Sequence, residues 1–182
     1  ASSSATFGGR LTGRRPVGRA TLLYTAEVAR QSDRGSNPRD FALTYLLLEP
    51  GIAAGPVTAK FGYERLDGNG QAAVQTPLAT LHAFNGWADK FLTTPPDGLR
   101  DLYLDLAVAP KAPGVPKGLA LRAVLHDFRS TNRNRPYGRE FDVQIGAPVG
   151  KRVSLLAKAA LYEARGFATD TAKFWLQAEA AF

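Results

Sequence analysis

The residue types that most often carry catalysis are scarce in this sequence of 182 residues. Its two histidines, His82 and His126, lie far apart, and no Gly-x-Ser-x-Gly motif accompanies them. Gly150 and Lys151 form a Gly-Lys pair but lack the glycine five positions earlier that a phosphate cradle needs. Cysteine is absent, which excludes disulfides, thiol catalysis and cysteine-metal sites. These observations predict no enzymatic activity, no metal site and no cofactor.

Charged side chains instead recur at every second position of several segments, and this spacing sets them on one face of a strand. In a polar channel, rings of such charges set the ion preference. The predicted pore-lining residues are Arg10, Glu27, Lys60, Glu64, Asp101, Asp105, Arg122, His126, Glu140, Asp142, Lys158, Lys173 and Glu179.

The predicted pore-lining charges suggest pairs of opposite sign, namely Lys60 with Glu64, Arg122 with Asp101 or Asp105, and Lys158 with Asp142 or Glu140. Two roles are open for them. As a set, the basic members would contact an anionic solute, and for this role we select Arg10, Lys60, Arg122, Lys158 and Lys173. Alternatively, the charges neutralise one another and keep neighbouring strands in register.

The composition narrows the possible partners. The formal net charge is +7, from 23 basic and 16 acidic residues, and 45% of the residues are hydrophobic, which argues against disorder. The basic residues are scattered, with Arg14 and Arg15 expected in the connection 13–19, and no aromatic-basic motif predicts nucleic-acid binding. No run of about 18 apolar residues predicts a transmembrane helix. No signal peptide is recognisable, so we expect a mature form or a fragment.

Segments of about ten residues alternate with turn-rich stretches, which predicts an all-β fold in one domain over residues 1–182. Each segment has one apolar face and one largely polar face. The nine expected strands are 5–12, 20–30, 41–52, 57–66, 99–108, 119–129, 139–147, 153–163 and 171–182.

Alternation alone also fits a soluble barrel with its apolar face inside. Two features favour the inverse arrangement, an antiparallel transmembrane β-barrel whose apolar faces contact outer-membrane lipid. The apolar faces are rich in alanine, and short connections (13–19, 53–56, 148–152) alternate with longer ones (30–40, 67–98, 129–138). Outer-membrane barrels combine tight periplasmic turns with longer extracellular loops in this way, although 109–118 and 164–170 depart from the rule.

The segment 41–52 fits the alternation least well, because Leu46, Leu47 and Leu48 follow one another before Pro50. We expect a bulge or a bend there, which would explain the lost register. Its expected apolar face carries Phe41, Leu43, Tyr45 and Leu47.

The chain ends on Phe182, and the apolar residues before it occupy every second position. We expect Phe182 to face lipid at the periplasmic rim, where aromatic girdles lie. A terminal Phe of this kind also resembles the signal by which outer-membrane barrels are recognised for insertion.

Three stretches carry a more specific likeness: QTPLATLHAFNGWADKFLTTPPDGLRDLYL at 75–104, LLYTAEVARQSD at 22–33 and FATDTAKFWLQAEAAF at 167–182. They resemble the carboxyl-terminal half of the alginate-export family of Gram-negative outer-membrane porins. The resemblance implies a bacterial outer-membrane barrel of about 18 strands with a polar pore for an anionic polysaccharide or small polar solutes. Because the chain supplies about half of these strands, we expect it to pair with amino-terminal strands in the same or another chain.

The stretch 67–98 is too long for an idle connection, and we expect an extracellular loop. Phe84, Trp87 and Phe91 would pack into the lumen as a constriction or cap its mouth, with a self-packed surface loop as the alternative. Residues 78–91 are expected to contain a short helical turn, because prolines flank them.

The function expected from these features is an aqueous outer-membrane pore for small polar or anionic solutes, among them an acidic polysaccharide such as alginate. Two alternatives remain at this stage: a non-conducting outer-membrane scaffold and a soluble ligand-binding β-barrel.

Overall fold

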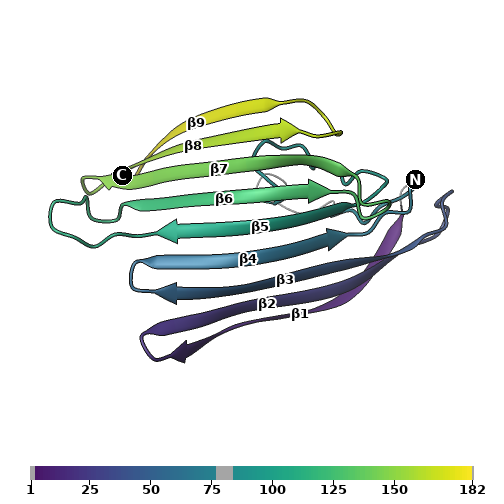
Figure 1. Ribbon diagram of the computed structural model, residues 1–182, viewed down its shortest axis with the longest axis horizontal. Helices are drawn as coiled ribbons and strands as arrows, with labels where there is room; N and C mark the ends of the chain where they lie inside the picture. The colour runs from purple at the N-terminus through teal and green to yellow at the C-terminus, as the bar shows by residue number, and fades with distance from the viewer. Residues whose placement is uncertain (1–2, 77–83, 182) are drawn as a thin grey trace.

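The computed structural model describes residues 3–76 and 84–181, which form one antiparallel sheet of nine strands (Figure 1). Each strand pairs with the next one along the chain, from β1 at one edge to β9 at the other. The strands are β1 (Ser4–Val17), β2 (Ala20–Asp33), β3 (Ala42–Ala54), β4 (Val57–Leu66), β5 (Leu99–Val108), β6 (Ala120–Arg129), β7 (Pro136–Val149), β8 (Val153–Ala164) and β9 (Thr171–Ala180). The prediction of an all-β antiparallel fold is confirmed. In the described part of the chain, no helix has the length and apolarity needed to span a membrane.

The connections differ between the two ends of the sheet. Two-residue turns join β1 to β2 and β3 to β4, and Gly18 and Gly55 begin them with φ of 59° and 55°, where a Cβ would be strained. The connections 109–119 and 150–152 lie at this end, which we call the turn end. The connections 34–41, 67–98, 130–135 and 165–170 lie at the opposite end, which we call the loop end.

The first strand is longer than the sequence predicts, because most of the expected connection 13–19 is strand. β1 continues to Val17, and Arg14 and Arg15 pair with Leu23 and Leu22 of β2. The arginines and Pro16 look like turn residues by composition, but the ladder with β2 keeps this segment extended until Gly18. At the other terminus, β9 ends at Ala180, and Phe182 lies outside the described residues.

The prediction for β3 is wrong in its choice of faces. The register places Leu47 opposite Glu64 of β4, so Leu47, Tyr45 and Leu43 share the face of the charged residues. The other face of β3 carries Leu46, Leu48 and Ile52.

The expected bulge in β3 is also absent from the described ladder. Leu48 pairs with Tyr63 and Gly51 pairs with Lys60, which is one register on both sides of Pro50. The run of three leucines is therefore explained without a break, because it places leucine on both faces in turn. A register shift does occur elsewhere, between Phe128 and Arg129 on β6.

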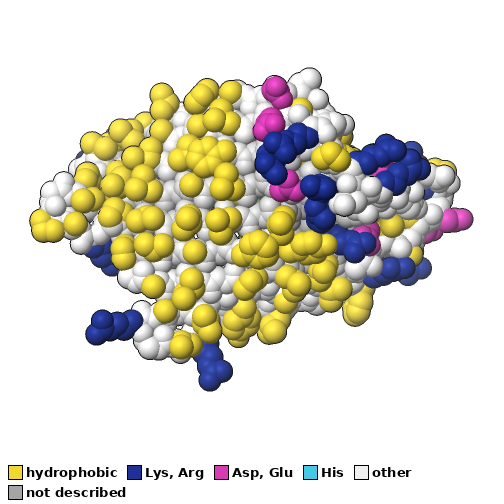
Figure 2. Space-filling model, in the orientation of Figure 1, with side chains coloured by type: hydrophobic (Ala, Val, Ile, Leu, Met, Phe, Trp, Pro, Cys, Tyr) yellow, Lys and Arg dark blue, Asp and Glu magenta, His cyan; other side chains and the backbone are white. Residues whose placement is uncertain are grey.

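The sheet has two chemically different faces. The inner face is the one on which the connection 67–98 packs, and it carries the charged side chains of the predicted pore lining. The outer face is turned toward the viewer in Figure 2 and is covered with apolar side chains. All nine strands contribute exposed apolar residues to it, among them Leu11, Val28, Ile52, Phe61, Leu104, Leu125, Phe141, Leu161 and Leu176.

The buried core lies between the inner face and the connection 67–98. Val74, Trp87 and Phe91 of this connection pack with residues on the inner face of the sheet, which we call the wall, such as Phe128 and Tyr162. A soluble sandwich or barrel buries its apolar face instead, so this arrangement is the inverse of the soluble one. The fold thus leaves the apolar face open and covers part of the polar face.

Candidate pore-lining site

The inner face brings together charged side chains from different strands. Across β1 and β2, Arg10 Nη1 lies 3.2 Å from Glu27 Oε2. Across β3 and β4, Lys60 Nζ lies 2.9 Å from Glu49 Oε1. The predicted pair of Lys60 with Glu64 is not formed, because four residues along one strand span about 13 Å.

Two basic residues of β6 bind carboxylates of the neighbouring strands. Arg122 donates from Nε and Nη2 to the two oxygens of Asp105, at 3.0 Å each, so one of its two predicted partners is confirmed. His126 Nδ1 lies 2.9 Å from the Asp101 carboxylate, and its Nε2 lies 3.7 Å from Asp142 Oδ2. These contacts tie β5, β6 and β7 together on the inner face.

Residues 84–91 of the connection, which we call the loop segment, are fastened to the inner face through backbone N–H groups. Trp87 N–H donates to Asp142 Oδ2 at 3.1 Å, and Ala88 N–H donates to Glu140 Oε1 at 2.6 Å. Gly86 precedes them with φ of 85°, and a Cβ built there would lie 2.6 Å from Glu140 Oε2. Glycine at this position therefore lets the backbone come within reach of the two carboxylates.

Side chains fasten the loop segment at both sides. Asn85 Nδ2 donates to Glu64 Oε2 at 2.7 Å, while Glu64 Oε1 accepts a 2.7 Å hydrogen bond from the Tyr45 hydroxyl. On the other side, Lys173 Nζ of β9 lies 2.7 Å from Asp89 Oδ2. The loop segment thus crosses the inner face from β4 to β9.

The aromatic residues of the loop segment divide between buried and exposed. Trp87 is 5% exposed and Phe91 is 7% exposed. The Phe91 ring lies 4.6 Å from that of Phe128, and the Lys158 ammonium lies 4.3 Å from the centre of the Trp87 ring. Phe84 is 53% exposed. Of the three residues predicted for a constriction, two pack against the inner face and one is available to solvent.

The expected helical turn within 78–91 is not found in its described part. Residues 84–91 form bends and turns, and residues 77–83 lie outside the described residues. The backbone contacts with Asp142 and Glu140 explain this, because they require Trp87 and Ala88 to direct their N–H groups toward the wall.

A glutamine pair fastens the connection to β2. Gln75 N–H donates to Gln31 Oε1 at 2.9 Å, and Gln31 Nε2 donates to the Gln75 carbonyl oxygen at 2.9 Å. Gln75 Nε2 also donates to the carbonyl oxygen of Thr94, at 2.9 Å. The connection is therefore attached to the wall outside the loop segment as well.

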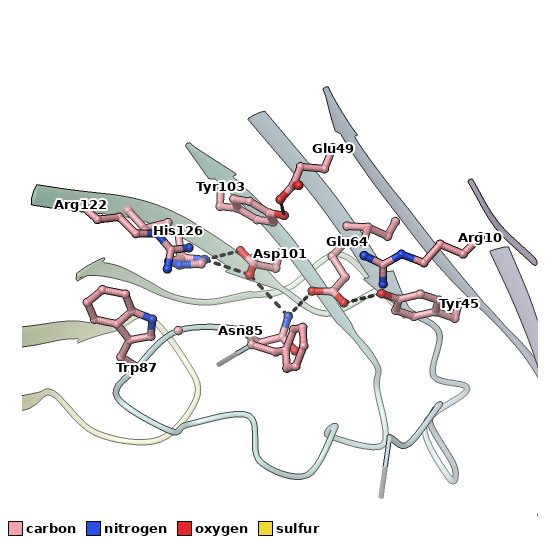
Figure 3. Close-up of a pocket in the computed structure, with 14 residues that line it drawn as sticks. Arg10, Tyr45, Glu49, Glu64, Asn85, Trp87, Asp101, Tyr103, Arg122 and His126 are labelled. Carbon is pink, nitrogen blue, oxygen red and sulfur yellow. Dashed lines mark hydrogen bonds and ion pairs between the residues drawn. The ribbon is translucent and has the colours of Figure 1, made fainter. Parts of the chain in front are cut away.

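A cavity of about 210 Å³ lies between the loop segment and the wall (Figure 3). In Figure 3, Arg10 and Arg122 flank the cavity from opposite sides, and Glu64 and Asp101 lie between them. Such a mixture of cations and carboxylates can bind and orient a polar solute through charge and hydrogen bonds. In residues 3–76 and 84–181, no group of three or more His, Asp or Glu side chains is placed to hold a metal ion.

Glu179, a predicted pore-lining residue, lies apart from the loop segment, and several polar residues on the inner face or in the loop segment are absent from the predicted set. Glu179 is exposed near the turn end, opposite Ser154 of β8. Tyr103, whose hydroxyl donates to Glu49 Oε2 at 2.6 Å, was not selected as a site residue, and neither was Glu49. Glu49 alternates in phase with Tyr45, and the wrong assignment of Tyr45 to the apolar face hid it. Gln31 alternates in phase with Glu27 but lies just beyond the expected strand 20–30. Periodicity gives no signal for Asn85, because Asn85 lies in the connection 67–98.

No protein-family model matches this chain, and no curated protein matches it. Two solved structures from Pseudomonas aeruginosa are similar to all of it. OccK5 (OpdH) has a TM-score of 0.75 at 12% identity, and 52% of its chain is covered. OccK3 (OpdO) has a TM-score of 0.72 at 17% identity, and 50% of its chain is covered. The chain therefore spans about half the length of each of these two outer-membrane porins.

At these identities the likeness is one of fold. It does not point to the alginate-export family in particular. Porins are transport channels, whereas the likeness gives no direct evidence on enzymatic activity. The nine antiparallel strands have the fold of half an outer-membrane porin barrel, a kind of barrel that lies in the bacterial outer membrane.

Proposed function

We propose that this chain forms about half of the wall of an aqueous outer-membrane pore, and that small polar or anionic solutes pass along its inner face. The remaining strands would come from the same chain or from another one. Lipid would cover the outer face, where every strand exposes large apolar side chains. The loop segment would narrow the pore, since it crosses the inner face.

The exposure of the ion-paired side chains supports a preference for anions. Arg122 is 40% exposed, whereas its partner Asp105 is 10% exposed. The cation is also the more exposed partner in the pairs of Arg10, Lys60 and Lys173. The four other predicted carboxylates of the strands under the loop segment, Glu64, Asp101, Glu140 and Asp142, are buried. A solute on this face would therefore meet mainly positive charge.

A more specific form of this proposal is that the transported solute is an acidic polysaccharide such as alginate. Its support is the resemblance of residues 75–104 to alginate-export porins, together with basic side chains on both sides of the inner face, from Arg10 on β1 to Lys173 on β9. An extended polyanion would contact several of these cations at once, which favours binding through multivalency.

A second candidate is a non-conducting barrel whose lumen is filled. The observation that favours it is the burial of Trp87 and Phe91 against the wall, since such packing occupies lumen space. The soluble ligand-binding barrel does not fit the fold, because the apolar face is open and the polar face is covered.

Conductance in planar bilayers tests the proposal. The purified barrel with its remaining strands present should conduct, and its reversal potential in a salt gradient should show a preference for anions. Replacing Arg122 and Lys158 together by Gln should reduce this preference, with a smaller effect at high salt, where screening lengths contract. Arg15→Gln is the matched control, because Arg15 pairs with Leu22 on the outer face. Absence of conductance would favour the filled barrel, and an unchanged reversal potential would remove Arg122 and Lys158 from the solute path.

A further inference from the structure

Three arginines stand side by side on the outer face near the loop end. Arg65 of β4 is the direct cross-strand partner of Arg100 of β5, and Arg100 is the direct partner of Arg129 of β6. Like charges directly opposite one another destabilise a sheet. A row of this kind therefore requires compensating negative charge close by.

The nearby carboxylates compensate this charge incompletely. Asp127 Oδ2 lies 3.2 Å from Arg129 Nε and 3.9 Å from Arg100 Nη2, while its Oδ1 lies 3.2 Å from Arg139 Nε. One carboxylate thus serves three guanidinium groups. Arg65 pairs with Asp67, and Arg165 pairs with Glu163 at 3.1 Å. Five arginines share three carboxylates in this group, so positive charge remains in excess.

An apolar groove of about 450 Å³ runs up to the same cluster on the outer face. Phe61, Leu104, Leu125 and Phe141 are among the residues that line it, and Asp127, Arg139 and Glu163 border it. Figure 2 shows that the outer face changes from apolar to charged along the strands, with apolar side chains over most of it and charged ones gathered toward the loop end. Arg139 belongs to both features, because it pairs with Asp127 and lines the groove.

This combination matches the chemistry of a phosphorylated lipid. Guanidinium groups bind phosphate through paired N–H donors, and several arginines together suit a doubly charged group. The groove has the apolar lining that an acyl chain requires. The loop end corresponds to the extracellular side of outer-membrane barrels, so the cluster would lie at the level of the outer-leaflet headgroups.

We propose that the outer-face arginine cluster and the adjoining groove bind a phosphorylated lipid of the outer leaflet, with the phosphate on Arg100, Arg129 and Arg139 and an acyl chain in the groove. Free phosphate would occupy half of this site, because it leaves the groove empty. The proposal rests on the outer face being the lipid-facing one, as in the proposed function, but it does not require that the pore conduct.

Lipid binding to the purified protein in detergent micelles tests this proposal. The probes are lipid A with its phosphates, the same lipid without phosphates, and inorganic phosphate, with bound lipid quantified by native mass spectrometry. Replacing Arg100 and Arg139 together by Gln should weaken binding of phosphorylated lipid A by about 30-fold. The control replaces Arg15 and Arg19 by Gln, which removes the same charge at the turn end and should leave binding unchanged.

Equal binding of the phosphorylated and dephosphorylated lipids would overturn the proposal, and so would equal losses in the test and control variants. Inorganic phosphate should compete weakly, and complete displacement of lipid A by it at equal concentration would show that the groove contributes nothing. If the double variant does not fold, Arg139→Gln alone serves, because the Arg139 side chain is 57% exposed. Conductance measured on the same variants separates the two proposals, since loss of lipid binding with unchanged conductance leaves the pore intact.

Discussion

At the level of single residues, the loop segment depends on one position that lacks a side chain. Gly86 has a φ of 85° and lies against the Glu140 carboxylate, and the next two N–H groups bind Asp142 and Glu140. These carboxylates are buried, so their hydrogen bonds to the loop replace contacts with water. Removing the bonds would leave Asp142 Oδ2 and Glu140 Oε1 buried without these hydrogen-bond donors, which is costly.

Gly86→Ala should therefore loosen the loop segment. The positive φ costs about 1–2 kcal/mol for a residue with a Cβ, and the contact with Glu140 adds to this. We expect lower stability in denaturant and a larger single-channel conductance, because the loop no longer lies close to the wall. Gly9→Ala is the control, since a Cβ at Gly9 meets nothing within 4 Å and its φ is not positive. Identical stability and conductance in the two variants would show that Gly86 has no such role.

At the level of elements, we expect the outer face of each strand to contact lipid hydrocarbon and to tolerate charged side chains poorly. Leu104 of β5 and Val143 of β7 lie near the middle of their strands and are 43% and 38% exposed. Either replaced by Arg should destabilise the barrel in a bilayer by about 2–4 kcal/mol near the midplane. The change is measured as the free energy of unfolding in lipid vesicles.

The control for these variants is Gln177→Arg, because Gln177 is exposed on the inner face of β9 and pairs with Leu156 rather than with a cation. Its side chain would remain on the polar side of the sheet, and we expect a cost below about 1 kcal/mol from such a polar exchange. A larger cost for Gln177→Arg than for Val143→Arg would mean that the two faces have been assigned the wrong way round.

The sequence predicts the strands well and the loop poorly, for a physical reason. Period-two alternation is a local property, so eight of the nine apolar faces could be read from it, and β3 was misread because Leu46, Leu47 and Leu48 supply leucine to both faces. Residues 84–91 instead owe their conformation to tertiary contacts, such as Trp87 with Asp142 and Asn85 with Glu64. No spacing along the chain encodes these contacts. The arginine row on the outer face likewise becomes visible once the strand register is known.

At the level of the whole molecule, the sheet is an open arc. Strand order runs from β1 to β9 with no β1–β9 pair among the described strands. Because every neighbour pair is antiparallel and nine is odd, β1 and β9 run in the same direction. Closing this arc on itself would create a parallel pair, contrary to the rule for bacterial barrels, and open edges in hydrocarbon cost several kcal/mol per unsatisfied group. We therefore expect additional strands between β9 and β1.

Thiol cross-linking tests this expectation in the membrane-inserted protein. Cysteines replacing Leu11 on β1 and Leu176 on β9 should not be joined by a short cross-linker, because other strands separate the two edges. The positive control joins Thr12→Cys and Thr25→Cys, which are direct cross-strand partners with their Oγ atoms 3.3 Å apart. An efficient intramolecular link between positions 11 and 176 would mean that the nine strands close without further strands.

The proposed pore wall can be examined at two adjacent positions, because this chain has no native cysteine. Val143 lies on the outer face and Gln144 on the inner face of the same strand. Single cysteines at these positions are exposed in turn to a charged, membrane-impermeant thiol reagent while single-channel current is recorded. We predict that the reagent reduces the current through Gln144→Cys and leaves the current through Val143→Cys unchanged. Reaction at position 143 with no effect at position 144 would contradict an aqueous pore along the inner face.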